Sequence, residues 1–162
     1  MLARGDCEHT SFYCEENVHR LLGRPELAEL PRWVVFISNV KNSCALWQQR
    51  AAGAGRWVIW DYHVVVMARH DDGIRVYDLD SRLTFPTPLA AYVTGTFPFA
   101  TRMPASCRPA SGWCRRTASS PPSARIDPTC ARRTAATRTR RPPGRRSRWR
   151  ACRRAPWPAS WT

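Results

Sequence analysis

A change of composition near Arg102 limits the part of this chain that can fold around a hydrophobic core. Residues 101–162 contain no Leu, Val, Phe or Tyr, and they consist mainly of Arg, Ala, Pro, Ser and Thr. Such a segment cannot bury enough apolar surface to offset the conformational entropy that is lost on ordering. We therefore expect one folded domain over residues 1–102, followed by a disordered low-complexity tail rich in Arg and Pro over residues 103–162.

The net charge of +14 belongs to this tail. Residues 101–162 carry sixteen Arg and one acidic residue, whereas residues 1–100 carry ten basic and eleven acidic residues. Clustered Arg binds phosphate backbones with a strong salt dependence, and the four tail tryptophans can stack on bases. An Arg-rich nucleic-acid-binding protein is therefore one alternative. The tail has no Lys and no Arg-Gly-Gly repeat, so we expect only non-specific binding to nucleic acids.

The seven cysteines form neither a C-x-x-C pair nor a Cys/His cluster with zinc spacing. Residues 1–20 lack the apolar segment of a signal peptide, and no apolar run reaches the ~20 residues of a membrane span. We expect free thiols, no bound metal, no membrane attachment, and a location in the cytoplasm, with the nucleus as an alternative.

The hydrophobic pattern predicts an α+β domain. Residues 1–9 are expected to form a frayed leader. A helix is predicted over residues 13–22, short helical turns over 25–31 and 89–93, and strands over 33–38, 57–67 and 74–80.

Cys14 lies where an extended polar entry changes into the predicted helix, with Ser11 as the expected N-cap. It precedes Val18 by four residues, so both side chains lie on the inward face. The free N–H groups of a helix start favour a nucleophilic thiolate, whereas Glu15 and Glu16 oppose it. The alternative interpretation of Cys14 is a small buried apolar residue.

The last two predicted strands form a hairpin that carries His63 and Asp78. The two side chains share a face in any register whose paired residue numbers add up to an odd value. A turn at residues 72–73 leaves them apart on that face, whereas a turn centred on residues 70–71 places them directly opposite. We expect the second register, with a β-bulge near Gly73.

If these side chains meet, Cys14, His63 and Asp78 form a nucleophile, a base and a group that orients the base. This is the arrangement of cysteine hydrolases. A core histidine and a solvated aspartate remain alternatives for His63 and Asp78 taken singly. Asp61 and Asp80 compete with Asp78 for the orienting role.

Several strings resemble the protein N-terminal glutamine amidohydrolase family, in the same order and at similar spacing, over about residues 10–102. They are Tyr-Cys-Glu-Glu-Asn at 13–17, Phe-Ile-Ser-Asn at 36–39, Trp-Gln-Gln at 47–49, Trp-Asp-Tyr-His-Val-Val at 60–65, Tyr-Asp-Leu-Asp at 77–80 and Phe-Pro at 85–86.

This resemblance implies an enzyme that deamidates the N-terminal glutamine of proteins and peptides in the N-degron pathway, releasing ammonia. Cys14, His63 and Asp78 fall on the positions of the family's catalytic residues, which act through a covalent thioester. The resemblance also implies a papain-like or transglutaminase-like core, with the helix carrying the cysteine packed on an antiparallel sheet, and a monomer without metal or cofactor. It requires an acceptor for the substrate's α-ammonium group, to which the sequence assigns no residue.

The resemblance stops after Arg102, where the family continues with a further part of its core. In a shifted reading frame, codons for residues 119–122 and 134–146 can encode strings that resemble the family's missing segments. We therefore interpret residues 103–162 as a frameshift product and the domain at 1–102 as incomplete. A catalytically dead truncated fragment is the corresponding alternative for function.

Overall fold

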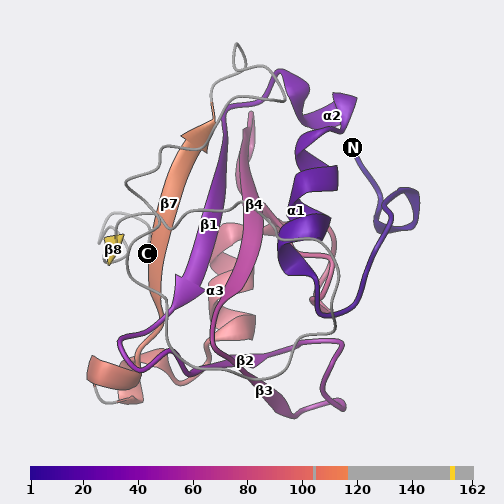
Figure 1. Cartoon of the computed structure of the whole chain (residues 1–162). Helices are drawn as coiled ribbons and strands as arrows, with labels where there is room; N and C mark the ends of the chain where they lie inside the picture. The colour runs from indigo at the N-terminus through magenta and orange to yellow at the C-terminus, as the bar shows by residue number, and fades with distance from the viewer. Residues whose placement is uncertain (104, 117–153, 156–162) are drawn as a thin grey trace, which may run out of the picture.

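The computed structural model describes residues 1–103, 105–116 and 154–155 (Figure 1). In this part of the chain every helix is too short or too polar to cross a membrane. The helices are η1 (Arg4–Asp6), α1 (Cys14–Leu22), α2 (Pro25–Ala28), α3 (Leu89–Thr96), η2 (Ala100–Arg102) and η3 (Ala105–Cys107). The strands are β1 (Arg32–Ser38), β2 (Cys44–Trp47), β3 (Trp57–Trp60), β4 (His63–His70), β5 (Gly73–Tyr77), β6 (Thr87–Pro88), β7 (Ala110–Arg116) and β8 (Arg154–Ala155).

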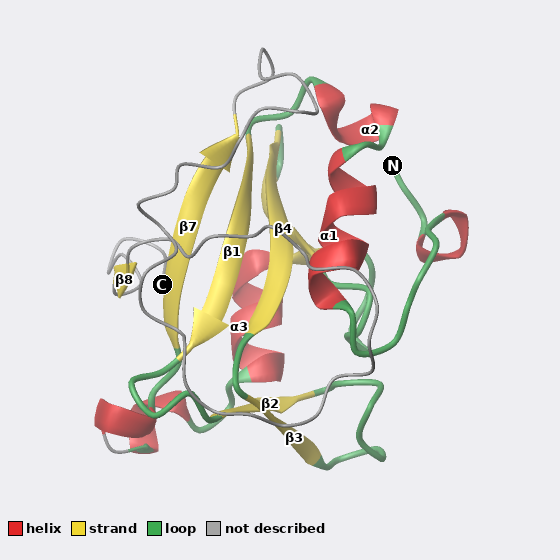
Figure 2. Ribbon diagram, in the orientation of Figure 1, coloured by secondary structure: helices red, strands yellow, loops and turns green. Residues whose placement is uncertain are grey.

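An antiparallel sheet with the order β6-β5-β4-β1-β7-β8 lies between α1 and α3. Figure 2 shows α1 on one face of the central strands and α3 on the other, with the small β2-β3 sheet below them. The predicted mixture of helices with an antiparallel sheet is therefore confirmed, as is the packing of the helix that carries Cys14 on that sheet.

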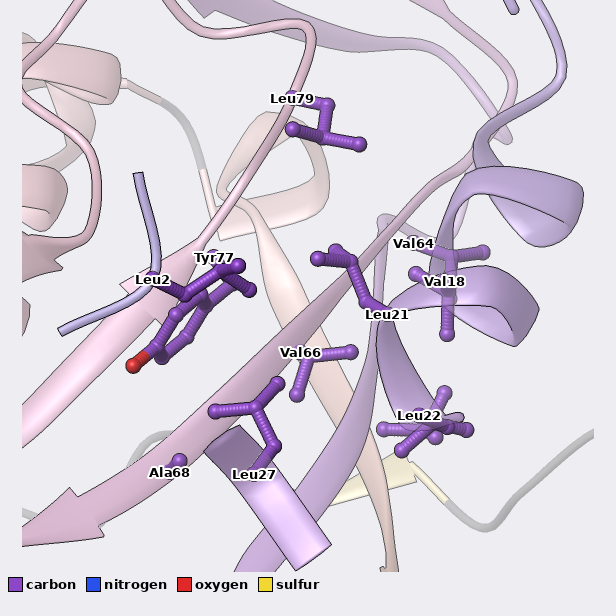
Figure 3. Packing of buried hydrophobic residues seen from close by; sticks show 11 residues of the cluster. Leu2, Val18, Leu21, Leu22, Leu27, Val64, Val66, Ala68, Tyr77 and Leu79 are labelled. Carbon is purple, nitrogen blue, oxygen red and sulfur yellow. The ribbon is translucent and has the colours of Figure 1, made fainter. Parts of the chain in front are cut away.

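Side-chain alternation along the strands gives the sheet two hydrophobic faces. Val34, Val64 and Val66 pack against α1 in one cluster, shown in Figure 3. Val35 and Val65 point the other way and join a second cluster with α3 and β2. Because both faces are covered, these strands read as continuous apolar runs rather than as alternating ones.

The strand predicted over residues 57–67 is wrong in its continuity. The chain leaves the extended course at Asp61 and Tyr62, so β3 pairs with β2 while β4 enters the main sheet. The Asp61 carboxylate accepts a hydrogen bond from the Tyr62 backbone N–H, and the Asp61 carbonyl accepts one from Ser38 Oγ. These local bonds replace the ladder bonds that a continuous strand would make.

The β4-β5 hairpin has a register between the two that the sequence suggested. Its pairs run from Val66 with Tyr77 to His70 with Gly73 without interruption, so the predicted bulge near Gly73 is wrong. The turn between the paired residues His70 and Gly73 consists of two residues. Gly73 has a φ of 125°, a backbone conformation that residues with a side chain rarely adopt. The paired numbers add up to an odd value, so the face predicted for His63 and Asp78 is correct.

The main sheet continues past residue 102, where the sequence places the end of the domain. The backbone of β7 pairs antiparallel with β1 along its whole length. The predicted disorder of the tail concerns mostly residues 117–153 and 156–162, which lie outside the described residues, and it stays a prediction.

Residues 1–9, expected to be a frayed leader, contact the core. Leu2 is only 3% exposed and belongs to the cluster under α1 (Figure 3). The leader therefore packs on the folded domain.

Candidate functional site

The three residues that the sequence singles out lie together at one end of the main sheet. His63 is the first residue of β4, and Asp78 directly follows β5. In an antiparallel hairpin the start of one strand and the end of its neighbour lie at the same edge. Cys14 begins α1, which packs on β4. The helix and the hairpin thus deliver a thiol, an imidazole and a carboxylate to one place.

His63 and Asp78 form a buried pair. His63 Nε2 lies 3.1 Å from Asp78 Oδ2, and the exposed fractions of the two side chains are 3% and 2%. The distance is within hydrogen-bond reach, although the ring N–H is not aligned on the oxygen. Since Nε2 faces Asp78, Nδ1 is the ring nitrogen left for the thiol.

Asp78 is held by further donors besides His63. Tyr92 Oη of α3 donates to Oδ2 at 2.8 Å, Gln49 Nε2 approaches it at 3.4 Å, and the Asp80 backbone N–H donates to Oδ1 at 2.9 Å. Burial alone would raise the pKa of Asp78. The charge of His63 and the hydrogen bonds outweigh burial, so the pKa lies below its ordinary value and the carboxylate stays ionised.

His63 is shielded from solvent by an aromatic neighbour. The Trp60 ring stacks on it with 6.4 Å between the ring centroids and 16° between the planes. Burial lowers the pKa of His63, but Asp78 and the Cys14 thiol more than reverse this effect, and the pKa lies well above its ordinary value. The ionised carboxylate therefore stabilises the imidazolium that forms when His63 takes up a proton.

The Cys14 thiol donates a hydrogen bond to Glu15 Oε2 at 3.5 Å, and it lies close enough to His63 and the Val64 backbone for both to act on its pKa. Burial raises the pKa of the thiol, the contacts with His63 and Val64 lower it in part, and the charge of Glu15 raises it. The predicted N-cap at Ser11 is wrong, since Tyr13 occupies that position without a side-chain bond. The free N–H groups of the first turn are thus not used by a capping side chain.

The Glu15 carboxylate lies beside the thiol. Its Oε2 is 3.5 Å from Cys14 Sγ, and its Oε1 accepts a short hydrogen bond from Tyr62 Oη. Burial and this contact with Glu15 raise the pKa of the Tyr62 phenol, which stays a neutral donor. Tyr62 therefore fixes the orientation of a half-buried anion next to the sulfur.

Arg4 of η1 holds the loop that carries Asp78. Its guanidinium donates to the carbonyls of Asp78, Leu79, Ser81 and Leu83 at 2.7–3.3 Å. A guanidinium presents five donors in a fixed fork, so one side chain can satisfy several carbonyls of a tight turn.

His9 continues the contact between the leader and this loop. Its Nε2 lies 2.7 Å from Asp80 Oδ1. Asp80, which the sequence offered as an alternative orienting group, thus pairs with the leader, while Asp78 faces His63.

We expect Arg4→Ala to lower the free energy of unfolding by about 2–3 kcal/mol, because it leaves several carbonyls of a partly buried turn without their charged donor. Urea denaturation followed by circular dichroism measures the change. Arg24→Ala is the matched control, since the ion pair of Arg24 is with the exposed Glu26 beside it. Equal stability losses in the two variants would contradict the role of Arg4.

His63, Asp78 and Asp80 are also the one group in the described part of the chain with spacing suited to a metal ion, with ligand atoms within 4.8 Å of one another. A cation there would replace the contact between His63 and Asp78. The contacts already described account for this grouping without a metal.

Sequence reasoning missed Gln49, Tyr92 and Arg4, all of which touch Asp78 or its loop. Gln49 and Tyr92 are fully buried polar residues far from Asp78 in sequence, and no local pattern marks them. Arg4 stands in a polar segment that resembles a leader. Only Glu15 carried a signal, since a carboxylate next to a nucleophilic thiol opposes its ionisation.

Comparison with known proteins identifies the family of this chain. The sequence profile described as N-terminal glutamine amidase matches residues 9–111, more than half of the chain. An Arabidopsis thaliana protein named protein N-terminal glutamine amidohydrolase is 46% identical over 99 residues, which cover 55% of this chain and 45% of that protein. A protein of the same name from Drosophila mojavensis is 46% identical over 100 residues, with 57% and 48% covered. This chain spans about half the length of these curated relatives. The chain belongs to the N-terminal glutamine amidase family.

Proposed function

We propose that this protein deamidates the N-terminal glutamine of proteins and peptides to glutamate with release of ammonia. The observation that carries the proposal is the buried contact of Cys14, His63 and Asp78 within a segment that matches the amidase family. A thiol, an imidazole and a carboxylate in this order suit nucleophilic attack on an amide.

In the first half of the proposed reaction, His63 Nδ1 takes the proton of the Cys14 thiol. The thiolate attacks the carbonyl carbon of the glutamine side chain, and the carbonyl oxygen becomes an oxyanion. The free N–H groups at the start of α1 are the available donors for this oxyanion. The imidazolium then protonates the departing nitrogen, ammonia leaves, and a thioester joins Cys14 to the substrate.

In the second half, His63 removes a proton from water, and the hydroxide attacks the thioester carbonyl. The carbon–sulfur bond breaks, the sulfur is reprotonated by His63, and the substrate leaves with glutamate at its N-terminus. Asp78 keeps the Nε2 side of the ring protonated through both halves, so that Nδ1 can accept and return the proton.

The accompanying assignments are part of the same proposal. The core is papain-like or transglutaminase-like, because a helix that begins at the cysteine packs beside the strand that begins at the histidine. The protein acts as a monomer in the cytoplasm, within the N-degron pathway. The four cysteines at positions 7, 14, 44 and 107 are free thiols, which a reducing compartment preserves.

The alternative is a catalytically dead fragment of that enzyme. The test incubates the full chain with two peptides that differ only in an N-terminal Gln or Asn. Mass spectrometry follows the gain of about one dalton, and an enzymatic assay follows ammonia. Turnover of the Gln peptide alone supports the proposal. No turnover of either peptide by a folded chain supports the dead fragment instead.

A further inference from the structure

The carboxylate of Glu15 is the anion in contact with the sulfur. Its Oε2 lies 3.5 Å from Cys14 Sγ, while Tyr62 Oη holds Oε1. Both of these groups, the thiol and the phenol, are neutral hydrogen-bond donors to the carboxylate. Neutral donors orient a half-buried carboxylate but do not neutralise its charge, so it is suited to receive a cation from outside.

Neighbouring acids are already engaged. Glu16, the next residue of α1, is exposed and pairs with Arg20 at 2.7 Å. Asp80 pairs with His9 at 2.7 Å, and Asp78 pairs with His63. Glu15 therefore differs from them in lying against the thiol and in being held by neutral donors.

The Glu15 carboxylate next to Cys14 opposes formation of the nucleophilic thiolate unless the negative charge of Glu15 is neutralised. The negative charge of Glu15 raises the pKa of the Cys14 thiol and so disfavours the thiolate in the free protein. A cation that binds Glu15 would remove this penalty at the moment when the substrate arrives.

We propose that Glu15 binds the α-ammonium group of the substrate, with Tyr62 orienting the carboxylate. This inference rests on the proposed function and assigns the residue that recognises a chain terminus. In an N-terminal glutamine, four bonds of about 1.5 Å separate the α-nitrogen from the side-chain carbonyl carbon. A reacting carbon about 3–3.5 Å from Sγ can therefore coexist with an ammonium about 2.8 Å from Oε2.

Recognition and activation are then coupled. The ammonium of a substrate cancels the charge of Glu15 and favours the Cys14 thiolate. A glutamine inside a chain carries no such charge, so it gains neither the ion pair nor the activated thiol.

The test compares two peptides of identical sequence. One begins with Gln, and the other begins with a glutaramoyl group, which is Gln with its α-amino group replaced by hydrogen. The wild-type chain should favour the Gln peptide by at least ~30-fold in kcat/KM. In Glu15→Gln this preference should fall by tenfold or more, roughly the effect of losing a half-buried ion pair, with glutaramoyl turnover unchanged or higher. Glu16→Gln makes the same charge change on the exposed face and should keep the wild-type preference.

A preference that falls by less than about tenfold in Glu15→Gln would overturn the inference while leaving the proposed function intact. Equal loss of both activities would also overturn it, because Glu15 would then act regardless of the substrate's charge. If the wild-type chain leaves every Gln peptide unchanged, the proposed function fails, and the inference fails with it.

Two further measurements test the inference independently: the first uses a different variant, and the second does not require turnover. Tyr62→Phe keeps the charge of Glu15 but removes its fixed orientation, so the preference should fall by roughly threefold. Iodoacetamide should alkylate Cys14 faster at pH 7 in Glu15→Gln than in the wild type or in Glu16→Gln, as read from the Cys14 peptide by mass spectrometry. Equal alkylation rates in all three proteins would overturn the coupling of recognition to activation.

Discussion

Replacing Cys14 by alanine is expected to reduce deamidation of a Gln-starting peptide by at least ~10⁴-fold, to the background rate. The variant loses the atom that forms the thioester, and no other thiol touches His63 among the described residues. Stability should change little in comparison, because Cys14 is a small side chain at a helix start. Ammonia release and thermal unfolding, measured on the same preparations, separate the two effects.

Cys7→Ala is the matched control for this variant. Cys7 is also a half-buried free thiol, but its Sγ faces the Ala3 carbonyl, away from the imidazole. This variant should keep near wild-type turnover. If Cys14→Ala retained measurable thioester chemistry, or if Cys7→Ala lost activity equally, another nucleophile would have to be sought.

The second large effect is expected at Asp78. Asp78→Asn should lower kcat by about 10³–10⁴-fold, because the amide cannot replace both carboxylate oxygens. Oδ1 accepts from the Asp80 backbone N–H and Oδ2 accepts from Tyr92, so the asparagine NH₂ must face one of these donors or His63. An NH₂ group against Nε2 moves the imidazole proton to Nδ1, where it prevents proton transfer from Cys14.

The pH dependence of Asp78→Asn follows from the same contact. Burial lowers the pKa of His63 and Asp78 raises it above its ordinary value. Without the Asp78 charge, burial prevails and the pKa of His63 falls, so the imidazolium is lost at a lower pH. His63 must be neutral to take the thiol proton, so the acid side of the pH–rate profile of kcat/KM should shift to lower pH in the variant. An unchanged profile would contradict the pairing.

The folded-state pKa values of Asp78 and His63 also predict the pH range in which this pair stabilises the fold. The folded-state pKa of Asp78 is lowered, so its contribution is complete above the unfolded value of about 4 and is lost as pH falls through the folded pKa. The folded-state pKa of His63 is raised, so its contribution is complete below about 6.5 and is lost as pH rises through the folded pKa. The difference in unfolding free energy between wild type and Asp78→Asn should be largest between about pH 4 and pH 6.5, as measured by urea denaturation.

Tyr92→Phe tests whether turnover depends on the charge of Asp78 or on the hydrogen bonds that position its loop. This variant removes one hydrogen bond at 2.8 Å but keeps the ionised carboxylate opposite His63. Turnover should fall only about tenfold or less, with the pH profile in place. A loss as large as that of Asp78→Asn would mean that the geometry of the loop, rather than the charge, governs the rate.

Local sequence was sufficient for the parts of this protein that depend on short-range physics. The 3.6-residue periodicity after Cys14 predicted α1 within one residue, and β-branched runs predicted β1 and β5. The alternation of side chains along the hairpin placed His63 and Asp78 on one face even though the expected register was wrong. Every register in which the numbers of two paired residues add up to an odd value puts these side chains on the same face. The strings around these residues marked the family, whose profile covers residues 9–111.

Tertiary structure decided what depends on contacts between distant segments. The break at Asp61 and Tyr62 sends one apolar run into two sheets, and the polar leader returns to hold the Asp78 loop through Arg4. The sequence alone could not assign the charge of Glu15 to a function, because its contact with Tyr62 and its position against the thiol appear only when the chain is folded. Hydrophobic periodicity depends on residues that are close in sequence, so it can be recognised in the sequence. Buried polar contacts depend on which distant groups the packed core brings together, so the sequence pattern does not reveal them.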